Sequence, residues 1–527
     1  EETEELQETL KSLGQYIPIS ARDNERIVKA AKKQRSFLPI SVASNLDWKT
    51  FSNVNVNMPD LPGIQPDVGT SRFYPQRELA AHIVGYVGSV SEEELTGDPL
   101  LELPDFKIGK NGVEKVLDEK LRGSAGNSKV EVNVLGRVIR ELSRQDSVSG
   151  ETTRLTIDLD LQKFVANRVR DESAGIVVMD IHTGEILAIA STPSFDPNDF
   201  NNGISQRKWD SLRGDIRKPL INKAVSGQYS PGSTFKMIVA LAALEDGIIT
   251  AHDEKYCGYT YRIGKRIAHC WNKNGHGRIN IIQALAQSCD VYFYDLALEV
   301  GIDKIHDMAA KFGIGERFNI GIMSEARGIN PNSEWKMGYS DERWSGGDTI
   351  NVGIGQGYVS TTALQLAVMA SRLANGGMAV KPKIFFDDED GTSIAEDMGI
   401  SPENLKIVLQ GMEDVYNDSR GTSFRYRLRD KDYKLAGKSG TTQVTGISAA
   451  ERQSGVIKND QKEWIGRDHA LFVSHGPVEQ PKFAVAVLLE HGGSGSIDAS
   501  PVARDILEYV IEQDRTRQNE NILGQDV

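Results

Sequence analysis

The sequence reads Tyr-Ser-Pro-Gly-Ser-Thr-Phe-Lys-Met from Tyr229 to Met237, and an apolar run follows it. The Pro-Gly pair predicts a turn and the apolar run predicts a helix, so Ser233 is expected at or near the helix N-terminus. Lys236 would stand on the same face, because three residues make almost one helical turn. Such a helix end suits a nucleophile that becomes anionic, and a neutral amine can take its proton. Alone, the tetrad also fits a surface serine beside a solvated lysine.

The composition is that of an ordinary globular protein. The 527 residues are too many for one hydrophobic core, so two or three domains are expected. A formal net charge of −13 argues against nucleic acid as the main partner. No apolar run is long enough to span a bilayer. Because the chain opens with Glu-Glu-Thr-Glu-Glu, without an initiator Met or a signal peptide, we expect that its beginning was cut; these residues leave open whether an anchor preceded it.

Residues 1–150 predict a separate module without a catalytic constellation. Helices are expected at Glu2–Leu13 and Asp23–Arg35, short strands and turns in 50–75, and a strand or hairpin at Lys129–Leu142. We interpret this module as a scaffold or a docking surface.

A polar stretch at Ser147–Thr152 predicts the boundary to a second domain over residues 151–515, followed by a tail at 516–527. Its first strands are expected as a buried hairpin at Gly175–Ile181 and Glu185–Ala190. Later helices are expected at Asn280–Gln287, Val291–Val300, Thr361–Leu373, Glu403–Tyr416 and from Pro501 to about Gln513, and closing strands at Tyr433–Ala436, Leu471–Ser474 and Phe483–Leu489. Strands at both ends with helices between them predict an α+β fold, one antiparallel sheet packed by helices.

Two further polar motifs follow the first. Ser288-Cys289-Asp290 lies between two expected helices, where an extended turn would point two polar groups the same way; a helix cap explains the same residues. Lys438-Ser439-Gly440-Thr441-Thr442 is expected on a strand edge, as a wall that binds a carboxylate. Glycine there lets a substrate backbone approach closely. A charge on Lys438 would also disfavour protonation of Lys236.

The order Ser-x-x-Lys, Ser-x-Asp, Lys-Ser-Gly resembles the penicillin-recognising acyl-transferases, in particular the class B penicillin-binding proteins of the elongation type. The segments that support this resemblance, besides the three motifs, are Gly109–Gly126, Gly175–Pro193, Gly275–Arg278, Gly437–Gln443 and Leu471–Gly493. The resemblance implies a transpeptidase fold, with an antiparallel sheet flanked by helices, a helical subdomain and an N-terminal α+β pedestal. Asp290 departs from the commoner Asn of the second motif, as in elongation-type members.

The resemblance also implies the chemistry, which is peptidoglycan D,D-transpeptidation. Ser233 would attack the penultimate D-alanine carbonyl of a donor stem peptide, with Lys236 as general base. Ser288 would relay the proton to the leaving amine, beside Asp290. Lys438 would hold the network and the substrate carboxylate.

Further features are implied in the same way. Backbone N–H groups of Ser233 and Thr441 would form the oxyanion hole, and Ser439, Gly440 and Thr442 would complete the substrate wall. β-Lactams would acylate the same serine, and no cofactor is required. Family members carry one N-terminal membrane helix and lie on the periplasmic side of the cytoplasmic membrane. The N-terminal module would then dock a membrane-embedded glycan polymerase.

Three cysteines and one histidine form a second candidate site. Cys257, Cys270, Cys289 and His276 would suit a closed tetrahedral Zn²⁺ site, with His269 as the alternative nitrogen ligand. Unpaired packed thiols, or one disulfide such as Cys257–Cys270, explain the same residues. Some elongation-type relatives carry a metal in this region, so the resemblance favours zinc.

Other functions fit parts of this pattern. A serine β-lactamase or a D,D-carboxypeptidase shares the acylation motifs and differs in letting water attack the acyl-enzyme. A non-catalytic β-lactam sensor would keep the pocket without the reaction. A septal transpeptidase would differ mainly in its partners.

Overall fold

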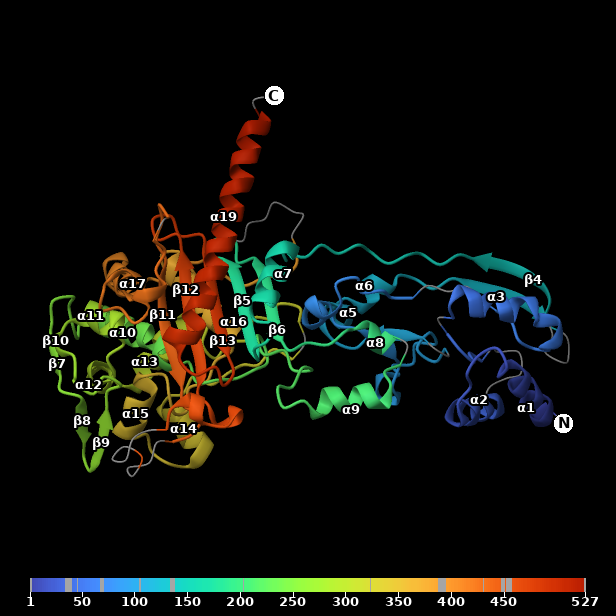
Figure 1. Cartoon of the computed structure of the whole chain (residues 1–527), viewed down its shortest axis with the longest axis horizontal. Coiled ribbons are helices and arrows are strands. Elements are labelled where there is room, and N and C mark those ends of the chain that lie inside the picture. Colours follow the sequence, from blue (N-terminus) through green and yellow to red (C-terminus); the bar gives the residue numbers. More distant parts are fainter. Residues whose placement is uncertain are drawn as a thin grey trace. The chain divides into compact units, whose positions relative to one another are not determined.

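The computed structural model describes residues 2–33, 40–44, 46–66, 71–103, 106–132, 138–201, 203–322, 324–386, 395–429, 431–446, 451 and 457–525. The chain divides into two compact units, one made of Glu1–Thr153 with Asp196–Asp210 and the other of Arg154–Phe195 with Ser211–Val527. Figure 1 shows both units and labels their helices and strands where there is room. No helix in these described ranges is long and apolar enough to cross a membrane.

Three helices open the first unit: α1 (Glu2–Leu13), α2 (Ala21–Lys33) and α3 (Trp48–Val56). The first two confirm the expected helices, whereas the short strands expected in 50–75 are wrong for residues 50–66 and 71–75, the part of that segment that the structure describes. Asp47 caps α3 by accepting a hydrogen bond from the backbone N–H of Thr50 at 2.6 Å, and Val54 is buried in a small apolar cluster. A cap and a buried contact therefore outweigh the strand propensity of the valines.

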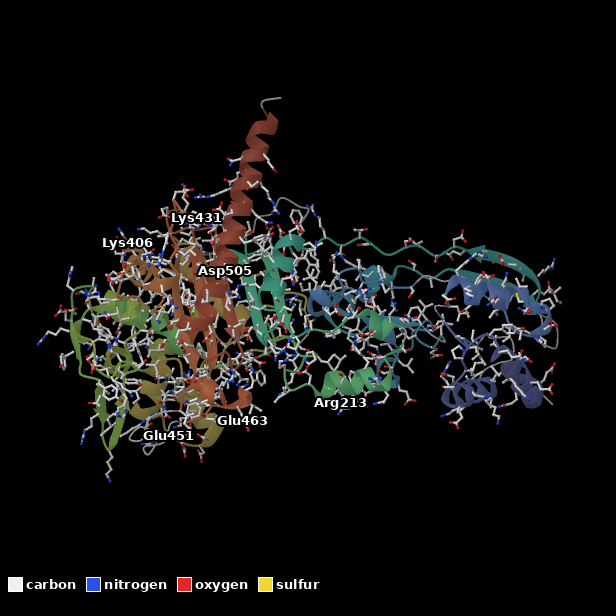
Figure 2. The ribbon with its side chains drawn as sticks, in the orientation of Figure 1. Arg213, Lys406, Lys431, Glu451, Glu463 and Asp505 are labelled. Carbon is white, nitrogen blue, oxygen red and sulfur yellow. The ribbon has the colours of Figure 1, made fainter. Side chains whose placement is uncertain are left out.

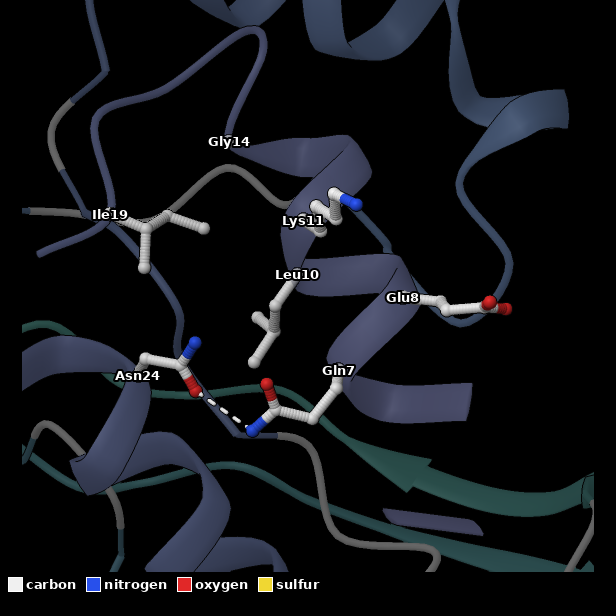
Figure 3. Close-up of a pocket in the computed structure, with 7 residues that line it drawn as sticks. All are labelled: Gln7, Glu8, Leu10, Lys11, Gly14, Ile19 and Asn24. Carbon is white, nitrogen blue, oxygen red and sulfur yellow. Dashed lines mark hydrogen bonds between the residues drawn. The ribbon is translucent and has the colours of Figure 1, made fainter. Parts of the chain in front are cut away.

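A pocket lies between α1 and the start of α2 (Figure 3). Its lining residues are Gln7, Glu8, Leu10, Lys11, Gly14, Ile19 and Asn24. The Gln7 amide donates a hydrogen bond to Asn24 Oδ1 at 3.2 Å, which joins the two helices. The lining contains no hydroxyl, thiol or imidazole, so this pocket lacks the serine side chains that the three motifs supply.

Short elements complete the first unit. They are α4 (Ala81–Val84), β1 (Val87–Ser89), β2 (Lys107–Gly109), α5 (Gly112–Val116), α6 (Asp118–Arg122), β3 (Asn127–Val132), β4 (Val138–Gln145), α8 (Asn198–Asn201) and the first part of α9 (Gln206–Gly214). Strands β3 and β4 pair antiparallel, which confirms the hairpin expected there. The Tyr74 hydroxyl donates to Glu114 at 3.3 Å and accepts from the Val87 N–H at 3.0 Å, so one buried polar network ties β1 to α5.

The second unit is built on one five-stranded antiparallel sheet in the order β11-β12-β13-β5-β6. The strands are β5 (Ala174–Asp180), β6 (Ile186–Thr192), β11 (Ala436–Thr442), β12 (His469–Gly476) and β13 (Phe483–Leu489). β13 is buried along its whole length, because α16 (Ala363–Ala374) packs against it on one face while α7 (Leu159–Arg168) and α19 (Ser500–Gln525) share the core of the other (Figure 1). The α+β prediction is confirmed, and α19 continues through the boundary expected at 515.

The rest of the second unit consists of helices and two small two-stranded sheets. The helices are α10 (Lys236–Glu245), α11 (Ile281–Ala286), α12 (Asp290–Val300), α13 (Ile302–Lys311), α14 (Ser333–Ser340), α15 (Gly346–Gly353) and α17 (Pro402–Asn417). One small sheet pairs β7 (Lys255–Cys257) with β10 (Gly277–Ile279), and the other is the hairpin of β8 (Thr260–Ile263) and β9 (Arg266–His269). All three motifs lie where α10, the α11–α12 turn and β11 meet, as the contacts below establish.

Candidate active site

The first motif forms a tight turn that enters a buried helix. Ser233 lies in a 3-10 turn, η4 (Gly232–Phe235), and α10 begins at Lys236. Gly232 has φ +56°, and a Cβ atom there would lie 2.9 Å from the Thr441 carbonyl oxygen. Its N–H donates to the Gly355 carbonyl at 2.8 Å. The absence of a side chain at Gly232 thus lets the turn that carries Ser233 press against β11.

The second motif differs from the extended turn that the sequence suggested. Ser288 has φ +54°, a left-handed conformation that is uncommon outside glycine, and Asp290 is the first residue of α12. Cys289 caps this helix, with its sulfur accepting the Tyr292 N–H at 3.5 Å. The strained backbone and the cap together set the directions of the Ser288 hydroxyl and the Asp290 carboxylate.

Two buried amines converge on the Ser288 hydroxyl. Lys438 Nζ lies 2.8 Å from Ser288 Oγ and 3.0 Å from the Ser439 carbonyl oxygen. Lys236 Nζ lies 3.4 Å from the same hydroxyl, 3.0 Å from the Ser288 carbonyl oxygen and 2.7 Å from Asp290 Oδ1. The structure thus brings one residue from each of the three distant motifs into a single hydrogen-bonded cluster.

Burial controls the charge of the third-motif lysine. Both lysines have 0% exposed surface. Desolvation is the largest effect on Lys438 and lowers the pKa of its amine well below the usual value, and the charge of Lys236 lowers it further. The Asp290 carboxylate acts in the opposite direction. Because a charged ammonium is disfavoured there, Lys438 can exchange a proton with its hydroxyl neighbour.

The third motif occupies β11, an edge strand of the sheet. The side chain of Ser439 lies on the opposite face from Lys438, with its hydroxyl 3.3 Å from Thr422 Oγ1. Thr441 Oγ1 accepts a hydrogen bond from the Gly495 N–H at 3.2 Å, and the Thr442 hydroxyl donates to the Ser230 carbonyl. These side chains brace β11 against its neighbours. The surface that β11 offers to a substrate is therefore mainly its backbone.

Two residues of the site were missed by the sequence analysis. The indole N–H of Trp271 donates to the Ser288 carbonyl at 3.1 Å, and its backbone N–H donates to Asp290 Oδ2 at 3.0 Å. The side-chain amide of Gln356 donates to the Thr441 carbonyl at 3.0 Å. The sequence contained a cue for each residue. Trp271 directly follows the candidate metal ligand Cys270, and Gln356 lies between two glycines, both of which have positive φ in the structure.

The cysteine cluster lies directly behind the second motif. Cys257, Cys270, His276 and Cys289 each offer one ligand atom, and these atoms all lie within 4.8 Å of one another. All three cysteines are free thiols, and the Cys270 sulfur lies 3.5 Å from His276 Nδ1. A hydrogen bond from Cys289 lowers the pKa of the Cys270 thiol, which favours a thiolate in the cluster. The group contains His276 and does not contain His269.

Family models match almost the whole chain. The model described as the penicillin binding protein transpeptidase domain matches residues 174–508, and the one described as the penicillin-binding protein dimerisation domain matches residues 1–155. The chain belongs to the penicillin-binding proteins. This membership confirms the family and the enzyme class that the three ordered motifs predicted.

Curated relatives and solved structures agree with this assignment. The peptidoglycan D,D-transpeptidase MrdA of Escherichia coli K12 is 33% identical, over 97% of this chain and 82% of its own. MrdA of Haemophilus influenzae is 34% identical, over 97% and 80%. Among solved structures, penicillin-binding protein PBP2 of Helicobacter pylori in complex with MreC superposes with a TM-score of 0.84 at 29% identity, over 97% of this chain and 92% of that one. PBP2 of Pseudomonas aeruginosa in complex with WCK 5153 gives 0.71 at 34% identity, over 84% and 92%.

Proposed function

We propose that this elongation-type penicillin-binding protein is a peptidoglycan D,D-transpeptidase that works through an acyl-enzyme on Ser233. The observation that carries the proposal is the convergence of two fully buried amines, from Lys236 and Lys438, on the hydroxyl of Ser288. Such a cluster can receive a proton from a serine and deliver it to a leaving amine. Its substrates are peptidoglycan stem peptides, and β-lactams are its covalent inhibitors.

In the first half-reaction, Ser233 Oγ attacks the penultimate D-alanine carbonyl of the donor and transfers its proton to Lys236, which acts as the base in its neutral form. Backbone N–H groups of Ser233 and Thr441 stabilise the tetrahedral oxyanion. The peptide C–N bond then breaks, and the departing amine takes a proton through Ser288. Lys438 holds Ser288 in place and, with the backbone of β11 at Gly440, binds the terminal carboxylate.

In the second half-reaction, the amine of an acceptor stem peptide attacks the acyl carbon. The bond from that carbon to Ser233 Oγ breaks, and the serine regains its proton as the new peptide bond forms. A D,D-carboxypeptidase or a β-lactamase would use water in place of the amine. The curated MrdA relatives favour the transpeptidase, since 97% of this chain aligns with them.

Intact-mass analysis after penicillin treatment tests the acyl-enzyme. We expect one stable adduct per chain, mapped to Ser233, and none in Ser233→Ala. Rapid turnover of the drug without an adduct would support a β-lactamase and overturn the proposal. A Ser233→Ala variant that still supports cell-wall growth would instead support a non-catalytic sensor.

The cysteine cluster fits a structural Zn²⁺ ion. Three thiols and one imidazole are a complete tetrahedral donor set, and His276 Nε2 is buried without a hydrogen-bond partner among the described residues. Zn²⁺ held by Cys257, Cys270, His276 and Cys289 would stabilise the start of α12 and supply no step of the reaction. Metal analysis should find about one zinc per chain in the wild type and none in Cys257→Ser. A metal-free wild type that keeps full thermal stability would overturn this assignment.

The N-terminal residues 1–150 would act as a pedestal for residues 151–515. In this role the module docks a membrane-embedded glycan polymerase on the periplasmic side of the cytoplasmic membrane. The PBP2 of Helicobacter pylori is solved in complex with MreC, which makes an MreC-type protein a second candidate partner. The test is a pull-down of the polymerase and the MreC-type protein with a variant that lacks residues 1–150. Recovery of both partners at the wild-type level would contradict the docking role.

A further inference from the structure

One segment of the second unit has a charge opposite to that of the whole chain. From Lys255 to Cys289 the sequence contains six Lys and Arg residues and no Asp or Glu, whereas the chain as a whole carries a net charge of −13. Five of the six are exposed: Arg262, Lys265, Arg266, Lys273 and Arg278. We call these five residues the basic rim.

The cations of the basic rim are not neutralised by the protein. The sixth cation, Lys255, is paired with Asp295 at 2.6 Å and Glu299 at 2.7 Å. None of the five rim residues forms an ion pair with any carboxylate in the described ranges. Among the described residues, the side chain of Arg266 hydrogen-bonds only the neutral amide of Asn351, at 2.9 Å. Exposed cations without an acidic partner attract anionic groups.

Two chains of contacts connect the basic rim to the reactive cluster. Trp271, between Arg266 and Lys273 in sequence, is bonded to the Ser288 carbonyl at 3.1 Å while its side chain is 59% exposed. On the other side, Arg266 is bonded to Asn351, whose carbonyl accepts the Gln356 N–H at 2.9 Å. Gln356 in turn bonds the Thr441 carbonyl at 3.0 Å. Arg266 is therefore linked to the third motif, and the sequence segment that carries the rim is linked to the second motif through Trp271.

We propose that the basic rim binds the free carboxylates of the acceptor stem peptide, the substrate whose amine resolves the acyl-enzyme. This inference rests on the proposed transpeptidase function and names how its second substrate is recognised. The donor has its own anchor, because Lys438 and β11 take its terminal carboxylate and Ser233 then holds it covalently. The acceptor has no covalent anchor and must compete with water for the acyl carbon, so it depends on surface charge for its local concentration.

The test separates acyl transfer from acylation in the full chain. The variant is Arg262→Glu with Lys265→Glu, two exposed residues of the β8–β9 hairpin. Its matched control is Lys406→Glu with Arg429→Glu, which makes the same charge change at exposed residues of the same unit that have no ion pair in the described ranges; Figure 2 labels Lys406. The probes are a synthetic acceptor peptide with two free carboxylates and the same peptide with both amidated.

We expect the KM for the carboxylate acceptor to rise about tenfold in the hairpin variant, with kcat almost unchanged. The amidated acceptor, the control variant and the rate of fluorescent-penicillin acylation should not change. In the wild type, a higher salt concentration should weaken the binding of the carboxylate acceptor and leave the binding of the amidated acceptor unchanged.

Three results would overturn the proposal. Equal KM values for the wild type and the hairpin variant would exclude the rim as an acceptor site. An equal rise in KM for the free and the amidated peptide in the hairpin variant would show a steric effect and not recognition of carboxylates. Binding of the wild type to phosphatidylglycerol vesicles, lost in the hairpin variant while acyl transfer stays intact, would assign the rim to a lipid surface. A wild type that forms no Ser233 adduct would instead refute the proposed function itself.

Discussion

Two buried basic side chains on neighbouring strands of the sheet differ in their hydrogen-bond partners. Lys438 on β11 pairs in register with Val473, and His475 lies two residues farther along β12, on the same face. Lys438 is 0% exposed and His475 is 2% exposed. Lys438 has hydrogen bonds to Ser288 and Ser439, whereas neither ring nitrogen of His475 has a partner in the described part of the chain.

Burial lowers the pKa of both groups, to about 4 for His475. The desolvation of Lys438 keeps a reactive amine beside the site. The proposed mechanism does not use His475. Its desolvation only makes the free energy of unfolding depend on pH. A perturbed pKa thus indicates a functional residue only where partners for proton exchange lie within reach.

The strongest test of this contrast is Lys438→Met, which keeps the length of the side chain and removes the amine. Acylation by penicillin should slow by about 10²- to 10⁴-fold, because Ser288 loses its buried partner. The free energy of unfolding at neutral pH should not fall, since a desolvated amine has been replaced by an apolar group. Stopped-flow acylation and urea denaturation measure the two effects. A variant that acylates normally would remove Lys438 from the proposed mechanism.

The next effect is on acid stability. Below about pH 6.5 an unfolded chain protonates His475, while the folded chain resists protonation down to about pH 4. Stability should therefore fall as the pH drops through this window, by about 3 kcal/mol from this residue.

His475→Gln should remove that share of the pH dependence and leave penicillin acylation unchanged. Denaturant unfolding at pH 7 and pH 4.5 gives the change in the free energy of unfolding with pH, which is the slope to compare. His469, whose pKa burial also lowers to about 4, retains its own share in the variant, so part of the slope should remain. Identical slopes in wild type and variant would show that His475 is solvated or partnered in solution.

The smallest effect concerns the residue that positions Ser288. Trp271→Phe removes the indole N–H that bonds the Ser288 carbonyl, and acylation should slow about fivefold, the equivalent of about 1 kcal/mol. The matched control is Trp344→Phe in the same unit, whose indole N–H donates to Thr349 Oγ1 at 2.8 Å. Restored acylation in Trp271→His, which keeps an N–H donor, would distinguish positioning from bulk. Equal rates for Trp271→Phe and the control would contradict the role.

The sequence predicted those parts of the molecule that short-range patterns determine. The β5–β6 hairpin and helices α10 to α12 follow from apolar runs broken by turn residues. The three motifs were recognisable because each carries its chemistry within five residues. Segment 50–75 was misread, since alternating valines there outweighed the capping signal of Asp47.

Other features depend on contacts between distant segments. Trp271 reaches Ser288 across 17 positions and Gln356 reaches Thr441 across 85, and no periodicity announces either contact. The left-handed backbone of Ser288 could not be foreseen from residue type, because serine seldom adopts it. His475 was unremarkable in sequence, since its cost arises only when the surrounding strands and helices close over it.

The nucleophile turn is enclosed by glycines, and this limits how the enzyme can change. A Cβ atom at Gly355 would lie 2.0 Å from the Gly232 carbonyl oxygen, and one at Gly440 would lie 2.7 Å from the Pro231 carbonyl oxygen. Side chains cannot be added at either position without moving the serine itself. Variants that escape an inhibitor while still building cell wall must therefore arise farther out, at residues that alter access to the serine rather than its immediate surroundings.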